Sequence, residues 1–146
     1  MSVVTDTLIG MFDSWGILDH LPGWRVDWAW NPRHRGLTCF HTRTITLDAA
    51  LCRRDERCVL SHEVVHAERG PFPRWMRSRE ERVVASIAAR RLIPICTLAD
   101  ALAWSLTPAT VADELDVDVA TLNARLASLH PAERSYLIRR TEHHHA

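Results

Sequence analysis

The sequence has no excess of charge of either sign. Eighteen basic residues balance eighteen acidic residues over 146 positions, so the whole chain exerts no strong attraction toward nucleic acids or a membrane surface. It also lacks an apolar run near the roughly 20 residues that a helix needs to cross a bilayer. These absences argue against a membrane protein and lower the expectation of a dedicated DNA-binding protein.

Closely paired cysteines are absent, and the first residues do not have the pattern expected of a secretory leader. The four cysteines are well separated, without a C-x-x-C pair, at Cys39, Cys52, Cys58 and Cys96. Structural zinc sites have closely spaced ligands. The first residues show no basic stretch and no small-residue cleavage site, and Asp6 and Asp13 interrupt their apolar character. We therefore expect a cytoplasmic protein whose cysteines are thiols in or near the core.

No internal repeat or low-complexity linker divides the chain, and its length suits one domain with a small helical appendage. Apolar residues at helical spacing predict helices over residues 3–18, 55–68 and 78–93. From residue 97 onward the chain is expected to form several short helices. We therefore expect a core over residues 1–96 and a helical region over residues 97–146.

The strands are predicted between the first two helices. Large apolar residues alternate over residues 24–30, a period that is typical of a half-buried strand and places Trp24, Trp28 and Trp30 in the sheet core. Two further β-rich stretches, LTCFH and TITLD, are expected to pair through a turn near residues 42–43. The sequence thus predicts an α+β protein with a small antiparallel sheet.

The most informative stretch is VLSHEVVHAERG, residues 59–70, which contains an H-E-x-x-H motif on a predicted helix. His62 and His66 lie just over one turn apart, so both imidazoles project from the same face and can converge on one metal ion. Glu63 lies beside them without being a ligand itself. Zinc lowers the pKa of bound water from 15.7 to about 7, and Glu63 would then act as general base and general acid.

A catalytic zinc needs a third protein ligand and an open position. Glu81, on the next predicted helix, begins an inward face of small and apolar residues and is one candidate. Two alternatives remain open on spacing alone. Glu80 is the rival ligand, one residue and about 100° round the helix. Ser78-x-x-Glu81 is also a capping box, in which Glu81 would bond back to the N–H of Ser78.

These two helices resemble the ImmA/IrrE family of metallopeptidases. Family members pair an H-E-x-x-H helix with a later helix of the form E-x-x-A-x-x-F/W-A-A-x-x-L-x-P. The corresponding stretch here is ERVVASIAARRLIP, from Glu81 to Pro94. Val84, Ala85 and Ile87 depart from the family pattern, in positions that concern packing more than chemistry. The resemblance spans roughly residues 40–130, and the first 35 residues match loosely.

The resemblance implies a zincin-like core and one zinc ion per chain, held by His62, His66 and Glu81, with Glu63 as the catalytic residue. It also implies an endopeptidase whose partner is a regulatory protein, such as a helix-turn-helix repressor of a phage, mobile element or stress response. By analogy with zincins, the TITLD stretch (residues 44–48) would be an exposed edge strand to which a peptide adds. A zinc-fold binding protein without significant proteolysis is an alternative.

Residues 109–128 have the rhythm of a helix-turn-helix, so a DNA-binding regulator is a further alternative. The internal positions of this unit would be Ala112, Leu115, Val117, Leu122 and Leu126. Between residues 107 and 129, however, four acids (Asp113, Glu114, Asp116 and Asp118) face one base, Arg125, a net charge of −3. Since phosphate contacts dominate affinity for DNA, we expect no specific DNA binding by the chain alone.

Two groups of histidines need separate mention. His41 precedes the motif helix and is a candidate for stabilising an oxyanion, although an ordinary surface histidine is the simpler interpretation. The tail His143, His144 and His145 is expected to be disordered. It could bind metal adventitiously and interfere with a zinc assay.

Overall fold

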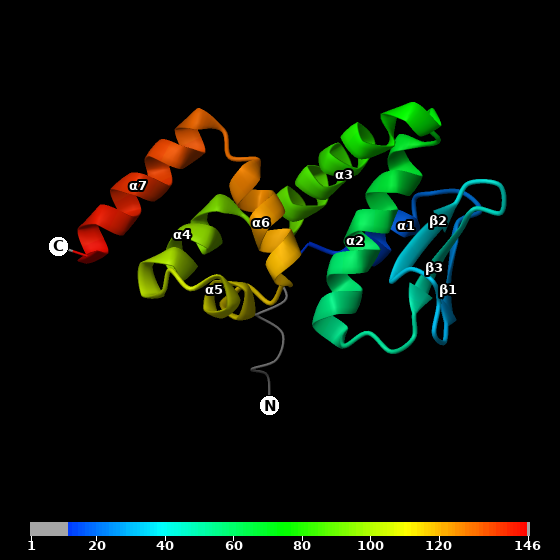
Figure 1. The fold of residues 1–146 in the computed structure, drawn as a ribbon, viewed down its shortest axis with the longest axis horizontal. Helices are drawn as coiled ribbons and strands as arrows, with labels where there is room; N and C mark the ends of the chain where they lie inside the picture. Colours follow the sequence, from blue (N-terminus) through cyan, green and yellow to red (C-terminus); the bar gives the residue numbers. More distant parts are fainter. Residues whose placement is uncertain (1–11, 146) are drawn as a thin grey trace.

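The structure is a computed structural model of the chain, and it describes residues 12–145. Within that range the fold is α+β, with seven α-helices and one three-stranded sheet. The sheet lies at one end of the molecule and α4–α7 at the other, with α2 and α3 between them (Figure 1). Between residues 12 and 145, no helix combines the length and the apolar character that a membrane crossing requires.

The sheet is mixed, which corrects the prediction of an antiparallel sheet. Its strands are β1 (Arg25–Ala29), β2 (Gly36–Cys39) and β3 (Thr44–Asp48), in the order β1-β3-β2. As predicted, β2 and β3 form an antiparallel pair. β1, however, pairs with β3 in parallel. The fully buried Ile45 and Leu47 place β3 at the centre of the sheet, so β1 and β2 become its two edges.

The prediction that three tryptophans form the sheet core is wrong for two of them. Trp28 is 49% exposed and Trp30 is 75% exposed, whereas Trp24 is partly buried beside the cluster between the sheet and α2. Since β1 is an edge strand, it offers a limited surface for burial. Trp28 packs instead against Trp15, with ring centroids 6.0 Å apart.

The two helices of the motif follow the sheet. α2 (Arg53–Arg69) ends at Gly70, whose φ of 86° is a conformation that favours glycine. A 3-10 turn, η1 (Arg74–Met76), leads into α3 (Arg77–Leu92). Both helices extend the predicted ranges of 55–68 and 78–93 at their N-termini. They pack through Val65 on α2 and through Val84 and Ala88 on α3.

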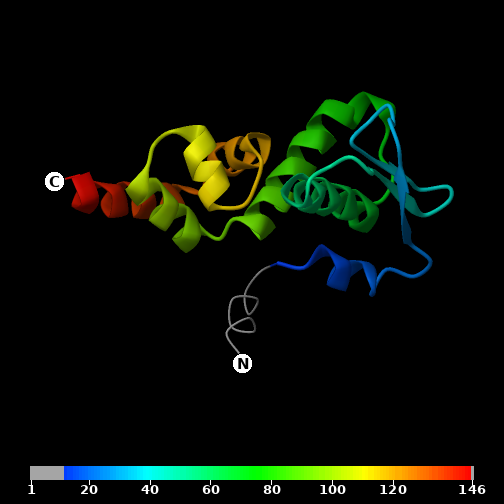
Figure 2. The same ribbon diagram turned by 90° about the horizontal axis from the view of Figure 1, so that it is seen from below.

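The first predicted helix is represented by α1 (Ser14–Leu18), and residues 3–11 of that prediction lie outside the described residues. The later helices are α4 (Ile95–Trp104), α5 (Pro108–Glu114), α6 (Val119–Ala127) and α7 (Pro131–His145). α7 includes the tail histidines predicted to be disordered. Figure 2 shows the C-terminus at the end of the molecule farthest from the sheet.

Of the cysteines, Cys58 is buried, but Cys52 and Cys96 are exposed, contrary to expectation.

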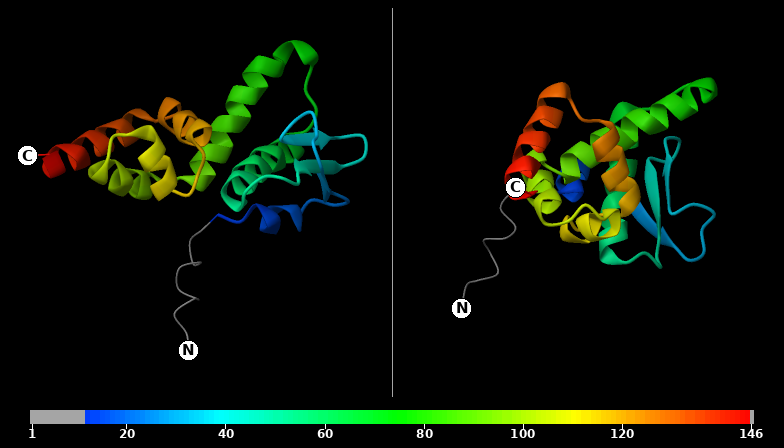
Figure 3. Two further views of the ribbon diagram at one scale, coloured as in Figure 1. Left: turned by 60° about the horizontal axis from the view of Figure 1, so that its bottom comes forward. Right: turned by 60° about the vertical axis from the view of Figure 1, so that its left-hand side comes forward.

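The helix-turn-helix rhythm corresponds to α5 and α6. The predicted internal positions Ala112, Val117 and Leu122 are all at most 1% exposed. They belong to one apolar cluster that also includes Cys58 of α2 and the C-terminal end of α3. α6 packs against α3, as both views of Figure 3 show.

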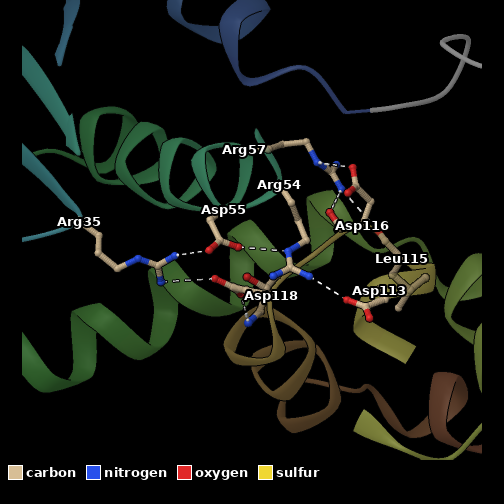
Figure 4. A network of polar contacts seen from close by, with 9 residues as sticks. Arg35, Arg54, Asp55, Arg57, Asp113, Leu115, Asp116 and Asp118 are labelled. Carbon is tan, nitrogen blue, oxygen red and sulfur yellow. Dashed lines mark hydrogen bonds and ion pairs between the residues drawn. The ribbon is translucent and has the colours of Figure 1, made fainter. Parts of the chain in front are cut away.

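Arginine–aspartate pairs attach this unit to α2 (Figure 4). Arg54 of α2 pairs with Asp113 of α5 at 2.8 Å. Arg57 donates a hydrogen bond to the backbone oxygen of Asp116 at 2.7 Å. Arg35, just before β2, lies 3.1 Å from Asp55 of α2 and 3.7 Å from Asp118, the N-cap of α6. Three of the four acids that oppose DNA binding in the sequence, Asp113, Asp116 and Asp118, therefore lie beside arginines of the same chain.

Candidate metal centre

α2 presents the two motif histidines toward α3. The ring centroids of His62 and His66 lie 5.0 Å apart, as expected for residues one helical turn apart. His66 is 6% exposed, and its ring stacks on Phe72 with centroids 5.9 Å apart. The His62 side chain is 28% exposed. One histidine is thus held firmly in the interior, and the other opens toward solvent.

Glu81 of α3 faces both imidazoles. One carboxylate oxygen, Oε2, lies 2.9 Å from His62 Nε2, and the other, Oε1, lies 3.1 Å from His66 Nε2. Ligand atoms of the three residues all lie within 4.8 Å of one another. This group could hold a metal ion. Two imidazole nitrogens and a carboxylate oxygen form a donor set that suits zinc, and three protein ligands leave a coordination position free.

The rival candidate, Glu80, has a different partner. Both of its carboxylate oxygens accept hydrogen bonds from the Arg69 guanidinium, at 2.5 Å and 3.1 Å. These bonds lower the pKa of Glu80. The capping-box alternative also differs from the structure: α3 begins at Arg77 after Met76, so Ser78 lies inside the first turn. The structure therefore brings Glu81, and not Glu80, to the histidines.

Glu63 lies on the buried side of the motif and is 8% exposed. The Thr38 hydroxyl of β2 donates a hydrogen bond to Glu63 Oε2 at 2.6 Å. Close approach of β2 makes this contact possible: a Cβ at Gly36 would collide with Val59 and lie 2.9 Å from Cγ of Glu63. Thr38 and Gly36 thus fix the orientation of the Glu63 carboxylate. Neither residue type signals this role in the sequence.

Two clefts flank the group. The first, of about 500 Å³, adjoins His66, Glu81 and Phe72. The second, of about 420 Å³, adjoins His62 and the facing surfaces of α3 and α6. Gly36, Glu63 and His34 line both clefts. The candidate metal centre therefore lies between these two clefts, together termed the groove, and each cleft reaches at least one of its three residues.

Two predicted features lie elsewhere. His41 is exposed in the turn between β2 and β3 and lines neither of these clefts. His34, whose sequence context gives no signal of a functional role, lines both. The TITLD stretch is the central strand β3, so it is not an exposed edge. The edge strand at the site is β2, whose Gly36 and Thr38 line the first cleft.

No protein-family model, curated protein or solved structure matches this chain.

Proposed function

We propose that the chain is a zinc-dependent endopeptidase of the ImmA/IrrE type, with a zincin-like core. The observation that carries the proposal is the convergence of His62, His66 and Glu81 from two helices, with the oriented carboxylate of Glu63 beside them. A metal centre that is purely structural would be closed by protein ligands. Here the group borders two clefts instead.

Each residue has a distinct role in this proposal. His62, His66 and Glu81 hold the ion, which when bound supplies a Lewis acid and lowers the pKa of water to about 7. Glu63 accepts the proton of the attacking water and transfers it to the leaving amine. The Thr38 hydroxyl holds one Glu63 oxygen, so the other oxygen is left for proton transfer. The two clefts would accommodate the chain on either side of the cleaved bond.

The proposed substrate is a peptide segment in extended conformation. β2 is an edge strand that borders the groove, so its free backbone groups could pair with such a segment. The resemblance to ImmA/IrrE proteins suggests a helix-turn-helix repressor as the physiological protein substrate. The second candidate function is a zinc-fold protein that binds such a repressor without cutting it, which keeps the same centre and clefts.

The test compares wild type with Glu63→Gln, both lacking residues 143–145 so that the tail histidines do not contribute metal. A random library of N-acetylated octapeptides is the substrate, because every internal cleavage creates a new free amine. We expect Glu63→Gln to retain zinc and to lose hydrolysis by at least the roughly 10²–10⁴-fold typical of lost acid–base catalysis.

Equal cleavage by both proteins would remove Glu63 from the mechanism. Co-expression with a candidate repressor separates the two functions. Fragments found with wild type and not with Glu63→Gln support the endopeptidase. Relief of repression by both proteins without fragments favours the binding protein.

A further inference from the structure

The first cleft carries two arginines beside the candidate metal centre. Arg74 of η1 and Arg77 at the start of α3 line it together with His66 and Glu81. Both arginines are exposed. Among residues 12–145, neither forms an ion pair within 4.0 Å, although many other arginines of this chain do. Their guanidinium groups are therefore available to a ligand.

The charges around this cleft favour an anion once the centre is loaded. In the described chain, the acidic residues that line it are Glu63 and Glu81. Glu81 belongs to the candidate metal centre, and Glu63 accepts a hydrogen bond from the Thr38 hydroxyl. A divalent cation offsets these two negative charges, so the two arginines remain as a net positive charge. An arginine presents a planar fork of donors that matches a carboxylate.

The segment that bears Arg74 and Arg77 is held in place by contacts on both sides of it. Its start is fixed by Phe72, which stacks on His66, between Pro71 and Pro73. The bidentate pair between Arg69 and Glu80 joins the end of α2 to the first turn of α3. Arg74 and Arg77 thus extend from a backbone whose position relative to the histidines is defined on both sides.

The second cleft differs in its electrostatics. It is lined by small side chains of α3 and α6, among them Ala88 and Ala124. The arginine on its rim, Arg35, is already paired with Asp55 and Asp118. The positive charge is therefore confined to one side of the centre, and a bound peptide would meet different surroundings on the two sides of the cleaved bond.

We propose that Arg74 and Arg77 form a carboxylate-recognition subsite, so that the substrate is a peptide with a carboxylate on one fixed side of the scissile bond. This inference rests on the proposed peptidase function and specifies its substrate class. The carboxylate comes from an aspartate or glutamate side chain, or from the free C-terminus of the peptide. The two sources share one chemistry and differ in where they lie in the peptide.

The experiment uses zinc-loaded protein without residues 143–145 and the acetylated octapeptide library in two forms, C-terminally amidated and with a free carboxyl group. Mass spectrometry locates the cleaved bonds for wild type and for the double variant Arg74→Glu/Arg77→Glu. The matched control is Arg79→Glu/Arg82→Glu, because these exposed arginines also lie on α3 but line another cleft. Zinc content and thermal melting verify that all variants fold.

We expect Asp and Glu to be enriched at one position relative to the cut, or cleavage to depend on the free terminus. The double variant should lower that preference at least about tenfold, in line with the loss of charge-assisted hydrogen bonds, and the control should retain it. Preference in the amidated library identifies the side chain as the source. Absence of any carboxylate preference, or a preference unchanged in the double variant, would overturn the proposal.

A binding selection separates this inference from the proposed function. Zinc-loaded Glu63→Gln is incubated with both libraries, and bound peptides are sequenced. If wild type cuts nothing, the peptidase fails, yet enrichment of carboxylate-bearing peptides that depends on Arg74 and Arg77 still supports the subsite. If wild type cuts without such preference, the peptidase stands and the subsite fails.

Discussion

Glu80 and Glu81 are neighbours on α3, yet they bind different partners. One residue along a helix turns the side chain by about 100°. Glu81 therefore faces His62 and His66, whereas Glu80 faces Arg69 and is 7% exposed. The same pair of carboxylates supplies both a candidate ligand and the ion pair that joins α2 to α3.

This arrangement predicts that two similar substitutions change different properties of the protein. Glu81→Gln should lower zinc affinity by more than the roughly 10–100-fold that loss of an outer contact costs, because an amide oxygen is a poorer ligand. Glu80→Gln should keep the zinc but lower thermal stability. Metal content and competition with a chelator measure the first effect, on protein without residues 143–145. Loss of zinc from Glu80→Gln with full retention in Glu81→Gln would contradict the assignment.

At this scale, the sequence could identify the residues that share one local element. The helical period is enough to place His62 beside His66. Spacing favours Glu81 but leaves Glu80 and the helix cap open, and the resemblance strengthens the choice of Glu81. Thr38, Gly36 and His34 could not be found, because their place at the site depends on how β2 packs across α2, a contact between distant segments. His41 precedes the motif helix in the sequence, but it lies in the turn between β2 and β3 and lines neither of the two clefts.

Among the elements, the local pairing of β2 with β3 was predictable and the order of the sheet was not. A hairpin is determined by a short turn and by alternation within each strand. The parallel pairing of β1 with β3 depends on which strand offers the most apolar surface, and Ile45 and Leu47 settle that competition. The exposure of Trp28 follows from the same cause, since an edge strand buries fewer of its side chains.

An ion cluster around the buried Arg125 joins α3, α6 and α7. Arg125 of α6 is 2% exposed, donates to the backbone oxygen of Ile93 at 2.8 Å, and pairs with Glu133 of α7. Arg90 of α3 donates to the same carboxylate at 2.7 Å. Hydrogen bonding to Arg125, followed by that to Arg90, lowers the pKa of Glu133 to about 2.

Removal of this carboxylate should destabilise the helical region. Glu133→Gln leaves the buried Arg125 without its charged partner, and we expect a loss of roughly 3 kcal/mol at neutral pH. Glu142→Gln, an exposed residue on the same helix, is the control. Chemical denaturation monitored by circular dichroism gives both values.

The pH dependence of this effect has a definite sign. Since the folded pKa of Glu133 is depressed, the stabilisation is fully present above about pH 4.5 and is lost as the pH falls toward 2. The difference between wild type and Glu133→Gln should therefore shrink across this interval. A difference that stays constant with pH would exclude the ion cluster as its source.

In the whole molecule, the helix-turn-helix-like unit of α5 and α6 packs against the rest of the chain and pairs with its arginines. One face of α6 contributes Leu122 and Arg125 to the interior, while Ala120, Thr121 and Ala124 line the second cleft. Asp118, Asp113 and Asp116 at its ends pair with Arg35, Arg54 and Arg57, as Figure 4 shows. The rhythm of residues 109–128 indicated the helices correctly, but their use as a wall of the groove depends on long-range packing.

We therefore expect no specific binding of duplex DNA by this chain alone. α6 packs against α3 on one side, and the unit carries few positive charges for phosphate contacts. Electrophoretic mobility shift at physiological salt, with random and candidate operator duplexes, is the measurement. Sequence-dependent retardation at sub-micromolar protein would favour the regulator hypothesis.

The exposed tryptophans give the molecule an optical property. Trp30, Trp75 and Trp104 are 75%, 83% and 85% exposed, so much of the intrinsic emission comes from indoles that already meet water in the folded state. Unfolding should then shift the emission maximum little. Trp75 follows Arg74 in η1, so we expect a peptide held by Arg74 and Arg77 to change the surroundings of its indole. The wild-type chain would then carry its own fluorescent reporter of occupancy, and Trp75→Phe identifies the share of this residue in the signal.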